Sequence, residues 1–245
     1  MNLKPHERIF VALDTPDIER ARALVAALRG RIGGYKVGLE LFTSHGPRLL
    51  DEILDSGSEV FLDLKFHDIP NTVAGAAAAA TRCGASFFTV HAGGGREMIR
   101  RAVESSGEAA ATAGLAPPVV LAVTVLTSHD DDELESIGLA GPCGAAVLRL
   151  AGLAREAGAG GLVCSPLELG KIRAAFPEGV VVVPGIRPAG LGTVARDDQS
   201  RTASPAAAVG AGADRLVIGR PITRAEDPAA AAEAIAEEVR LGESS

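Results

Sequence analysis

Aromatic residues are scarce in this chain. Only 3% of its 245 residues are Phe, Trp or Tyr, Trp is absent and Tyr occurs once, although 47% of the residues are hydrophobic. Any core must therefore be built from Val, Leu, Ile and Ala. Such a core suits a parallel sheet, whose strands are buried on both faces.

Cysteine is also rare, which excludes a disulfide framework and a cysteine-rich metal site. The chain has three cysteines, Cys83, Cys143 and Cys164, and no two of them have the spacing of metal ligands. We interpret all three as reduced thiols and expect a cytoplasmic protein.

Long apolar runs and an excess of basic charge are missing as well. No window approaches the roughly 18 apolar residues of a transmembrane helix, and the start of the chain lacks the apolar core of a signal peptide. Its 24 basic and 31 acidic residues give a net charge of −7. We therefore expect neither a membrane nor a nucleic acid as partner, and an anionic substrate would need a locally basic pocket.

Short β-rich runs alternate with helical stretches along the whole chain. Eight such units, at intervals of roughly 30 residues and without a linker, predict one domain over residues 1–245, a (β/α)8 TIM barrel. An open doubly wound sheet is the alternative. The expected strands are Arg8–Asp14, Tyr35–Leu39, Glu59–Lys65, Phe87–His91, Val119–Val125, Gly161–Cys164, Val180–Val183 and Asp214–Ile218.

Helices are expected in the gaps between these strands. The first is predicted to have Thr15 as N-cap and Pro16 at its first position, and to end near Arg29. Pro188–Ala203 is long for a connection between strand and helix, and we interpret it as a lid rather than a surface insertion. The other expected helices are Pro47–Asp55, Asn71–Arg82, Glu97–Ala113, Cys143–Ala157, Leu167–Phe176, Pro205–Gly210 and Pro228–Leu241, with a short extra helix at Asp130–Ile137.

Charged residues stand on the first three expected strands. Asp14 ends the first strand, Lys36 lies in the second, and Asp63 and Lys65 point to the same side of the third, with Asp68 just beyond. A barrel interior normally excludes charge, because an unpaired buried charge is costly. Asp63 and Lys65 alone could form an internal ion pair, but the whole group favours a catalytic site.

The run Asp63-Leu-Lys-Phe-His-Asp-Ile-Pro-Asn-Thr72 resembles the signature of the bacterial orotidine 5'-phosphate decarboxylase family. The resemblance covers nearly the whole chain. It implies decarboxylation of orotidine 5'-monophosphate to UMP and CO2, the last step of de novo UMP synthesis, by a homodimer that uses no cofactor and no metal. The other matching segments are Lys36-Val-Gly, Val-Thr-Val-Leu-Thr127-Ser, Pro184-Gly-Ile-Arg187-Pro, Asp198-Gln199 and Ile218-Gly-Arg220-Pro-Ile-Thr.

The resemblance also implies a role for each matching residue. Lys65 is expected to protonate C6 of the pyrimidine, and Asp63 to lie beside the substrate carboxylate. Lys36 and Asp68 would complete an alternating array of charges, with Asp68 and Thr72 contributed by the partner subunit. The remaining expected contacts are Asp14 and Lys36 with the ribose, Thr127 with the pyrimidine, and Gln199, Gly219, Arg220 and the nearby Arg187 with the phosphate.

Several other motifs have a chemical and a plainer interpretation. Gly93-Gly-Gly95 could cradle a phosphate but is more typical of a turn between strand and helix. We interpret His67 as a structural residue. His91 fits the role of a hydrogen-bonded structural histidine at least as well as that of a catalytic acid. The acidic run His129–Glu133 could bind a metal but favours a solvated helix start.

The sequence alone is also compatible with two other functions. A magnesium-dependent decarboxylase or aldolase of the same barrel group, acting on a sugar phosphate, shares the Asp-x-Lys-x-x-Asp pattern. The continuation Ile69–Thr72 and Gln199 favour the nucleotide enzyme. A catalytically silent barrel that only binds a phosphorylated ligand or another protein is the second alternative, and the intact charged array argues against it.

Overall fold

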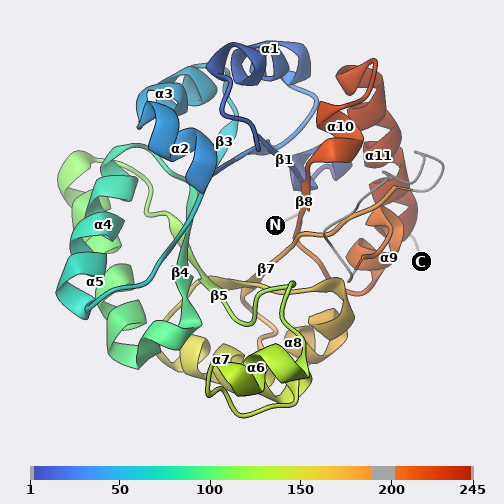
Figure 1. The fold of residues 1–245 in the computed structure, drawn as a ribbon. Coiled ribbons are helices and arrows are strands. Elements are labelled where there is room, and N and C mark those ends of the chain that lie inside the picture. The colour runs from blue at the N-terminus through green and yellow to red at the C-terminus, as the bar shows by residue number, and fades with distance from the viewer. Residues whose placement is uncertain (1–2, 189–201, 244–245) are drawn as a thin grey trace.

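Eight parallel strands form a closed barrel in chain order, with helices around it (Figure 1). The computed structural model describes residues 3–188 and 202–243. The first and last strands pair in parallel, Ile9 with Leu216 and Val11 with Ile218, and this pairing closes the sheet. The predicted (β/α)8 TIM barrel is confirmed, and the open doubly wound sheet is excluded.

All eight predicted strands are present, although several are shorter than expected. The first strand ends at Ala12 rather than Asp14, so the carboxylate of Asp14 lies beyond the ladder, where it can turn towards Lys36. The strands are β1 (Ile9–Ala12), β2 (Gly34–Gly38), β3 (Glu59–Phe66), β4 (Phe87–His91), β5 (Val119–Val123), β6 (Gly161–Val163), β7 (Val180–Val183) and β8 (Arg215–Ile218).

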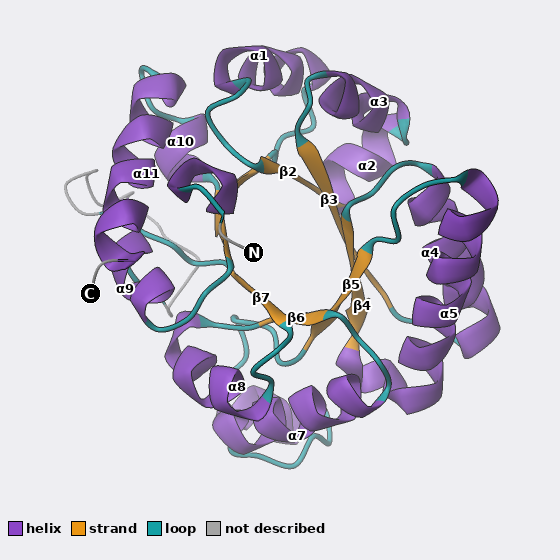
Figure 2. Cartoon of the chain, turned by 180° about the vertical axis from the view of Figure 1, so that it is seen from behind, coloured by secondary structure: helices purple, strands orange, loops and turns teal. Residues whose placement is uncertain are grey.

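The helices surround the strands on all sides, as the view from behind shows (Figure 2). The short helices α2 and α10, which directly follow β2 and β8, were not predicted. The α-helices are α1 (Ile18–Leu28), α2 (Leu39–His45), α3 (Arg48–Asp55), α4 (Pro70–Arg82), α5 (Gly95–Ala113), α6 (Asp131–Ser136), α7 (Cys143–Glu156), α8 (Leu169–Ala175), α9 (Pro205–Gly210), α10 (Arg220–Thr223) and α11 (Pro228–Glu243). Short 3-10 helices lie at Pro5–Arg8, Ala92–Gly94 and Pro166–Glu168.

The start of α1 differs from the prediction. Asp17, not Thr15, is the N-cap, and its Oδ1 accepts hydrogen bonds from the backbone N–H groups of Glu19 at 2.9 Å and Arg20 at 3.2 Å. The Thr15 hydroxyl accepts from the N–H of Asp17 instead. A carboxylate satisfies two helix-end donors and its charge suits the positive end of the helix dipole, so Asp17 is the better cap.

The amino end of the barrel is closed by aromatic side chains. Phe10, Phe61 and Phe87 pack edge to face, with ring centroids 5.4 to 6.3 Å apart. The guanidinium of Arg215 lies 5.8 Å from the Phe10 ring centroid and 5.7 Å from that of Phe87. It also pairs with Glu59 at 3.4 Å. Phe10, Phe61 and Phe87 form an aromatic plug, which fills the interior at the amino end. The active sites of (β/α)8 enzymes lie at the opposite, carboxyl end.

Polar side chains come next in the barrel interior on β3 and β4, because inward-facing positions recur every two residues along a strand. On β3 the inward position after Phe61 is Asp63, and on β4 the inward position after Phe87 is Thr89, which is 0% exposed. Side chains further along these strands therefore lie nearer the carboxyl end of the barrel. The charged residues of the sequence are placed at that end, where (β/α)8 enzymes have their active sites.

The cysteines Cys83, Cys143 and Cys164 are all free, as predicted. Within the described ranges, no helix is both long enough and apolar enough to cross a membrane.

A substitution at Gly34 tests how tightly the amino end of the barrel is packed. A Cβ at Gly34 would lie 2.3 Å from the carbonyl oxygen of Glu59 and 2.4 Å from Cε1 of Phe10, whereas a Cβ at Gly152, inside α7, would have no neighbour within 4 Å. Gly34→Ala is expected to lower the free energy of unfolding by about 1–3 kcal/mol through overpacking. Gly152→Ala should raise it by up to ~1 kcal/mol, because alanine favours a helix. Denaturant titration measures both changes, and equal effects of the two substitutions would contradict the packing argument.

Candidate active site

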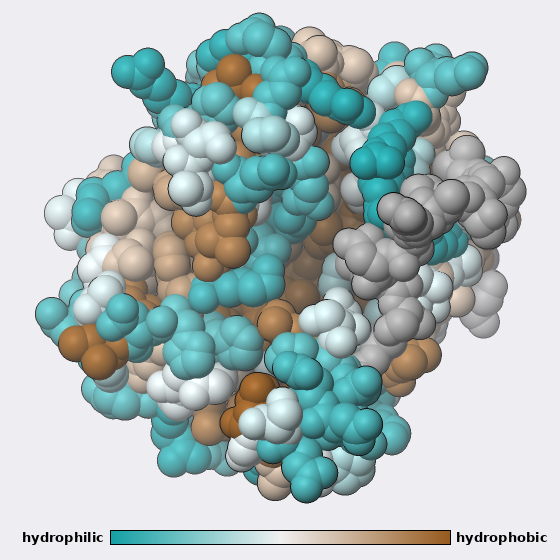
Figure 3. All heavy atoms as spheres, viewed as in Figure 1, coloured by the Kyte–Doolittle hydropathy of each residue, from teal (hydrophilic) through white to brown (hydrophobic). Residues whose placement is uncertain are grey.

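A cavity of about 610 Å³ opens at the carboxyl end of the barrel. Figure 3 shows the hollow over the barrel, with hydrophobic residues in its depth and mostly hydrophilic residues around its edge. The apolar side includes Val123, Val125 and Leu126 from the end of β5 and the loop after it. Eight of the predicted site residues line the cavity: Asp14, Lys36, Asp63, Lys65, Thr127, Arg187, Gly219 and Arg220.

Four of these residues form a continuous row of alternating charge. Nζ of Lys36 lies 2.9 Å from Oδ1 of Asp14 and 3.8 Å from Oδ2 of Asp63. Nζ of Lys65 lies 2.9 Å from both carboxylate oxygens of Asp63. The side chain of Asp63 is 14% exposed and that of Lys36 is 12% exposed. The central carboxylate is therefore shared by two ammonium groups in a largely water-excluded place.

A local irregularity of β3 places Lys65. Lys65 has φ 50°, the only positive φ of a non-glycine residue in the described part of the chain. Leu62 pairs with Phe88, but Phe66 then pairs with Val90, so β3 has extra residues between these pairs. A bulge of this kind redirects a side chain and is frequent beside active sites.

Gly38 makes room for the neighbouring ion pair. A Cβ at Gly38 would lie 3.1 Å from Nζ of Lys36 and 3.6 Å from Oδ1 of Asp14. A larger residue at the end of β2 would therefore press on both charged groups. The glycine of the Lys36-Val-Gly segment thus leaves space for the ion pair of Lys36 and Asp14.

Thr89 also belongs to the site, although it was not predicted. Its hydroxyl donates a hydrogen bond to Oδ1 of Asp63 at 3.0 Å and accepts one from the backbone N–H of Lys65 at 2.8 Å. A sequence signal existed, because the two-residue period from Phe87 points Thr89 into the barrel. What the sequence did not indicate was that β4 places this hydroxyl beside Asp63.

Arginines give the cavity its positive potential. Arg187 and Arg220 were predicted here, and Arg20 and Arg224, which were not, also line it. Nη2 of Arg20 donates to the carbonyl oxygen of Thr223 at 3.1 Å, which links α1 to α10. A concentration of guanidinium groups within an acidic protein is the local basic pocket that an anionic substrate requires.

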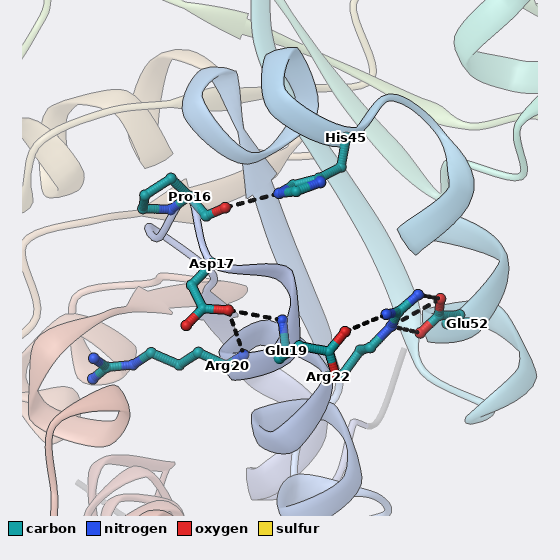
Figure 4. A network of polar contacts seen from close by, with 7 residues as sticks. All are labelled: Pro16, Asp17, Glu19, Arg20, Arg22, His45 and Glu52. Carbon is teal, nitrogen blue, oxygen red and sulfur yellow. Dashed lines mark hydrogen bonds and ion pairs between the residues drawn. The ribbon is translucent and has the colours of Figure 1, made fainter.

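A polar network holds the loop between β1 and α1, which carries Asp14 (Figure 4). Nε2 of His45 on α2 donates to the carbonyl oxygen of Pro16 at 2.8 Å. Arg22 pairs with Glu52 on α3, with 2.6 Å between Nη2 and Oε1. The side chain of Arg20 extends away from this network. The loop is thus attached to α2, and α1, the helix that follows it, is attached to α3.

Two of the predicted residues are exposed, and a third lies outside the described part of the chain. Asp68 is exposed, and its Oδ1 accepts a hydrogen bond from the N–H of Ile69 at 2.6 Å. Thr72 is exposed on the first turn of α4. Among the described residues, the cavity lining includes neither of them. Gln199 and residues 189–201 of the predicted lid lie outside the described part of the chain.

His67 and His91 form a stacked pair beside the site. Their ring centroids are 5.2 Å apart and their planes differ by 15°. Burial lowers the pKa of His91, and the positive charges that His67, Lys65 and His129 can hold lower it further. Nδ1 of His91 accepts from the N–H of Gly93 at 3.4 Å. The contacts support the structural interpretation of both histidines and the turn interpretation of the glycines.

Two other groups have no chemical role in this geometry. Cys164 lines the cavity, but burial raises the pKa of its thiol to about 12, so it stays protonated at neutral pH and is a poor nucleophile. Asp130 in the acidic run is the N-cap of α6 and accepts from the N–H of Glu133 at 2.9 Å. The predicted solvated helix start is confirmed.

Comparison with known proteins agrees with this geometry. The model of the orotidine 5'-phosphate decarboxylase / HUMPS family matches residues 7–235. The orotidine 5'-phosphate decarboxylase of Anaeromyxobacter dehalogenans is 54% identical over 235 residues, which cover 96% of this chain and 99% of that protein. That of Halorhodospira halophila is 54% identical over 240 residues, 98% of each chain.

A solved structure is similar over the same range. The crystal structure of orotidine 5'-phosphate decarboxylase from Lactobacillus acidophilus superposes with a TM-score of 0.81 at 38% sequence identity, and the match covers 94% of this chain and 98% of that one. The resemblance inferred from the Asp63–Thr72 run is thereby confirmed over almost the full length. The chain belongs to the orotidine 5'-phosphate decarboxylase / HUMPS family.

Proposed function

We propose that this chain, acting as one domain over residues 1–245, decarboxylates orotidine 5'-monophosphate to UMP and CO2, the last step of de novo UMP synthesis. One observation supports this most directly: the carboxylate of Asp63 lies between the ammonium groups of Lys36 and Lys65, inside an arginine-lined cavity. The relatives that share its family carry the same activity in their names. We expect the protein to act in the cytoplasm.

The chemistry explains why an ammonium group is needed. Loss of CO2 from C6 of the pyrimidine leaves an electron pair on carbon, and no neighbouring carbonyl is placed to absorb it as a simple enolate. A fixed positive charge at C6 stabilises that pair and can then deliver a proton to it. Lys65 suits both tasks, because Asp63 holds its ammonium with both oxygens at 2.9 Å.

The other residues of the row and the cavity bind the rest of the nucleotide. Asp14 and Lys36, joined at 2.9 Å, contact the ribose hydroxyls, and Thr127 contacts the pyrimidine. Arg187, Gly219 and Arg220 hold the phosphate. Gln199 remains a predicted phosphate contact. Binding energy from the phosphate, far from C6, can be used to organise the reacting end of the substrate.

A homodimer completes the proposed site, with Asp68 and Thr72 reaching the cavity of the partner subunit. Both residues are exposed, and neither is among the described residues that line the cavity of their own chain, which supports this arrangement. The neighbouring Ile69 is 67% exposed and Leu39 is 58% exposed, so the same rim offers apolar surface. A two-fold interface would use this rim twice, reciprocally.

The activity itself is tested by following the absorbance of orotidine 5'-monophosphate with purified protein, with and without a chelator. We expect turnover in both conditions, because Lys36 and Lys65 supply the positive charge. Loss of turnover on chelation would favour the magnesium-dependent alternative. No turnover in either condition would favour a barrel that only binds a phosphorylated ligand.

The role of Lys65 is tested by two substitutions. Lys65→Ala should lower kcat by roughly 10³-fold or more, since both the stabilising charge and the proton donor are lost. Lys65→Arg keeps a charge but should also be nearly inactive, because a guanidinium does not release its proton. Lys171→Ala, at an exposed position of α8, is the matched control and should keep full activity. A Lys65→Ala protein within about tenfold of the wild-type kcat, only ~1.4 kcal/mol of barrier, would remove Lys65 from this role.

The shared site is tested by mixing two inactive variants. When Lys65→Ala and Asp68→Ala subunits exchange, one site of each heterodimer receives both defects and the other receives neither. Activity should therefore return, approaching one intact site per heterodimer. Lys65→Ala mixed with Asp63→Ala is the control, because both defects lie in the same subunit's part of the site and no intact site can form. If exchange is confirmed by mass and the first mixture stays inactive, Asp68 serves its own subunit.

A further inference from the structure

Thr89 connects the two central residues of the charged row although it carries no charge itself. It lies on β4, is 0% exposed, and its hydroxyl makes two hydrogen bonds, to Oδ1 of Asp63 at 3.0 Å and from the N–H of Lys65 at 2.8 Å. A hydroxyl has one proton to donate and lone pairs to accept. Both capacities are used here, one on each of the two residues.

The bond to the backbone of Lys65 stabilises an unfavourable conformation. Lys65 has φ 50°, in the left-handed region, which is sterically unfavourable for a non-glycine residue. The bulge between Leu62 and Phe66 interrupts the regular pairing of β3 with β4 at this point. The N–H of Lys65 therefore needs another acceptor in the barrel, and the Thr89 hydroxyl provides it.

The bond to Asp63 orients the carboxylate. Oδ1 of Asp63 accepts from Thr89, while both oxygens face Nζ of Lys65 and Oδ2 lies 3.8 Å from Nζ of Lys36. Without the hydroxyl, the carboxylate would be free to rotate between its two lysine partners. Rotation of the carboxylate would also move the ammonium of Lys65, because both carboxylate oxygens of Asp63 contact that ammonium.

We propose that Thr89 is a positioning residue, which holds the Asp63 carboxylate and the backbone of Lys65 in the one arrangement that directs the Lys65 ammonium at the reacting carbon. The proposal rests on the proposed decarboxylation. Thr89 acts through Asp63 and Lys65 and need not touch the substrate. The contacts that bind the ribose and the phosphate come from other strands, so substrate affinity should depend little on Thr89.

Two substitutions at Thr89 separate the effect of the hydroxyl from that of side-chain size, and a third substitution elsewhere serves as control. Thr89→Val keeps the shape and removes both hydrogen bonds, whereas Thr89→Ser keeps the hydroxyl and removes a methyl group. Thr81→Val is the matched control, because Thr81 is also buried and its hydroxyl donates to the carbonyl oxygen of Ala77, one turn earlier in α4. For each variant kcat, KM, binding of UMP and the thermal unfolding midpoint are measured.

We expect Thr89→Val to lower kcat on the order of a hundredfold, the effect of a small misplacement of a catalytic group. Its KM and its affinity for UMP should change little. Thr89→Ser should restore most of the lost kcat, and Thr81→Val should keep full activity. A loss of kcat with unchanged UMP binding and rescue by serine is a result that general loosening of the barrel does not produce.

Two results would overturn the proposal. A folded Thr89→Val protein with wild-type kcat would show that the hydroxyl is not needed, and a Thr89→Ser protein as impaired as Thr89→Val would assign the effect to packing of the methyl group. If Thr89→Val does not fold, Thr89→Cys compared with Thr89→Ser repeats the test with side chains of similar size.

A crystal structure of Thr89→Val separates this proposal from the proposed function. We expect Lys65 to leave the left-handed conformation and its ammonium to lie no longer against both oxygens of Asp63. An unchanged arrangement would refute the positioning role, even if the wild-type protein did not decarboxylate orotidine 5'-monophosphate. Absence of turnover in the wild-type protein would refute the function alone.

Discussion

A negative charge inside the barrel is the constraint on which the site depends. The side chain of Asp63 is only 14% exposed, and an isolated carboxylate there would be very costly. It is compensated by three groups: Lys65 at 2.9 Å, Thr89 at 3.0 Å and Lys36 at 3.8 Å. Lys36 in turn is held by Asp14. The row is therefore one interdependent unit, in which removal of any member leaves its neighbour's buried charge poorly paired.

The barrel separates this unit from the part that stabilises the fold. Phe10, Phe61 and Phe87 close the amino end, and the inward positions that follow on β3 and β4 are the polar Asp63 and Thr89. The plug gives β3 and β4 a packed base from which Asp63 and Thr89 project at a defined height. A charged layer directly above an aromatic one lets the protein keep the buried charges in a rigid frame without weakening its core.

The charge distribution of the whole chain contrasts with that of its cavity. The chain carries a net charge of −7, yet four arginines line the cavity that contains the charged row. An anionic nucleotide is thus attracted to one place on an otherwise repelling surface. The rim beside it is exposed at Asp68, Ile69 and Thr72, and in the proposed dimer each chain would supply this rim to the other.

Local patterns along the chain were enough to predict the eight βα units, the inward Asp63 and Lys65, and the family, because strand periodicity and the Asp63–Thr72 run each lie within short stretches of sequence. Other features are visible only in the folded barrel: Thr89 bonds to both residues, Arg20 and Arg224 line the cavity, and Lys65 takes a left-handed backbone. The structure also shows that the N-cap of α1 is Asp17, not the predicted Thr15. Gln199 and the lid remain predictions from the sequence. The difference has a physical reason: the contacts between neighbouring strands depend on register and on where a bulge falls, and packing across the whole barrel sets both.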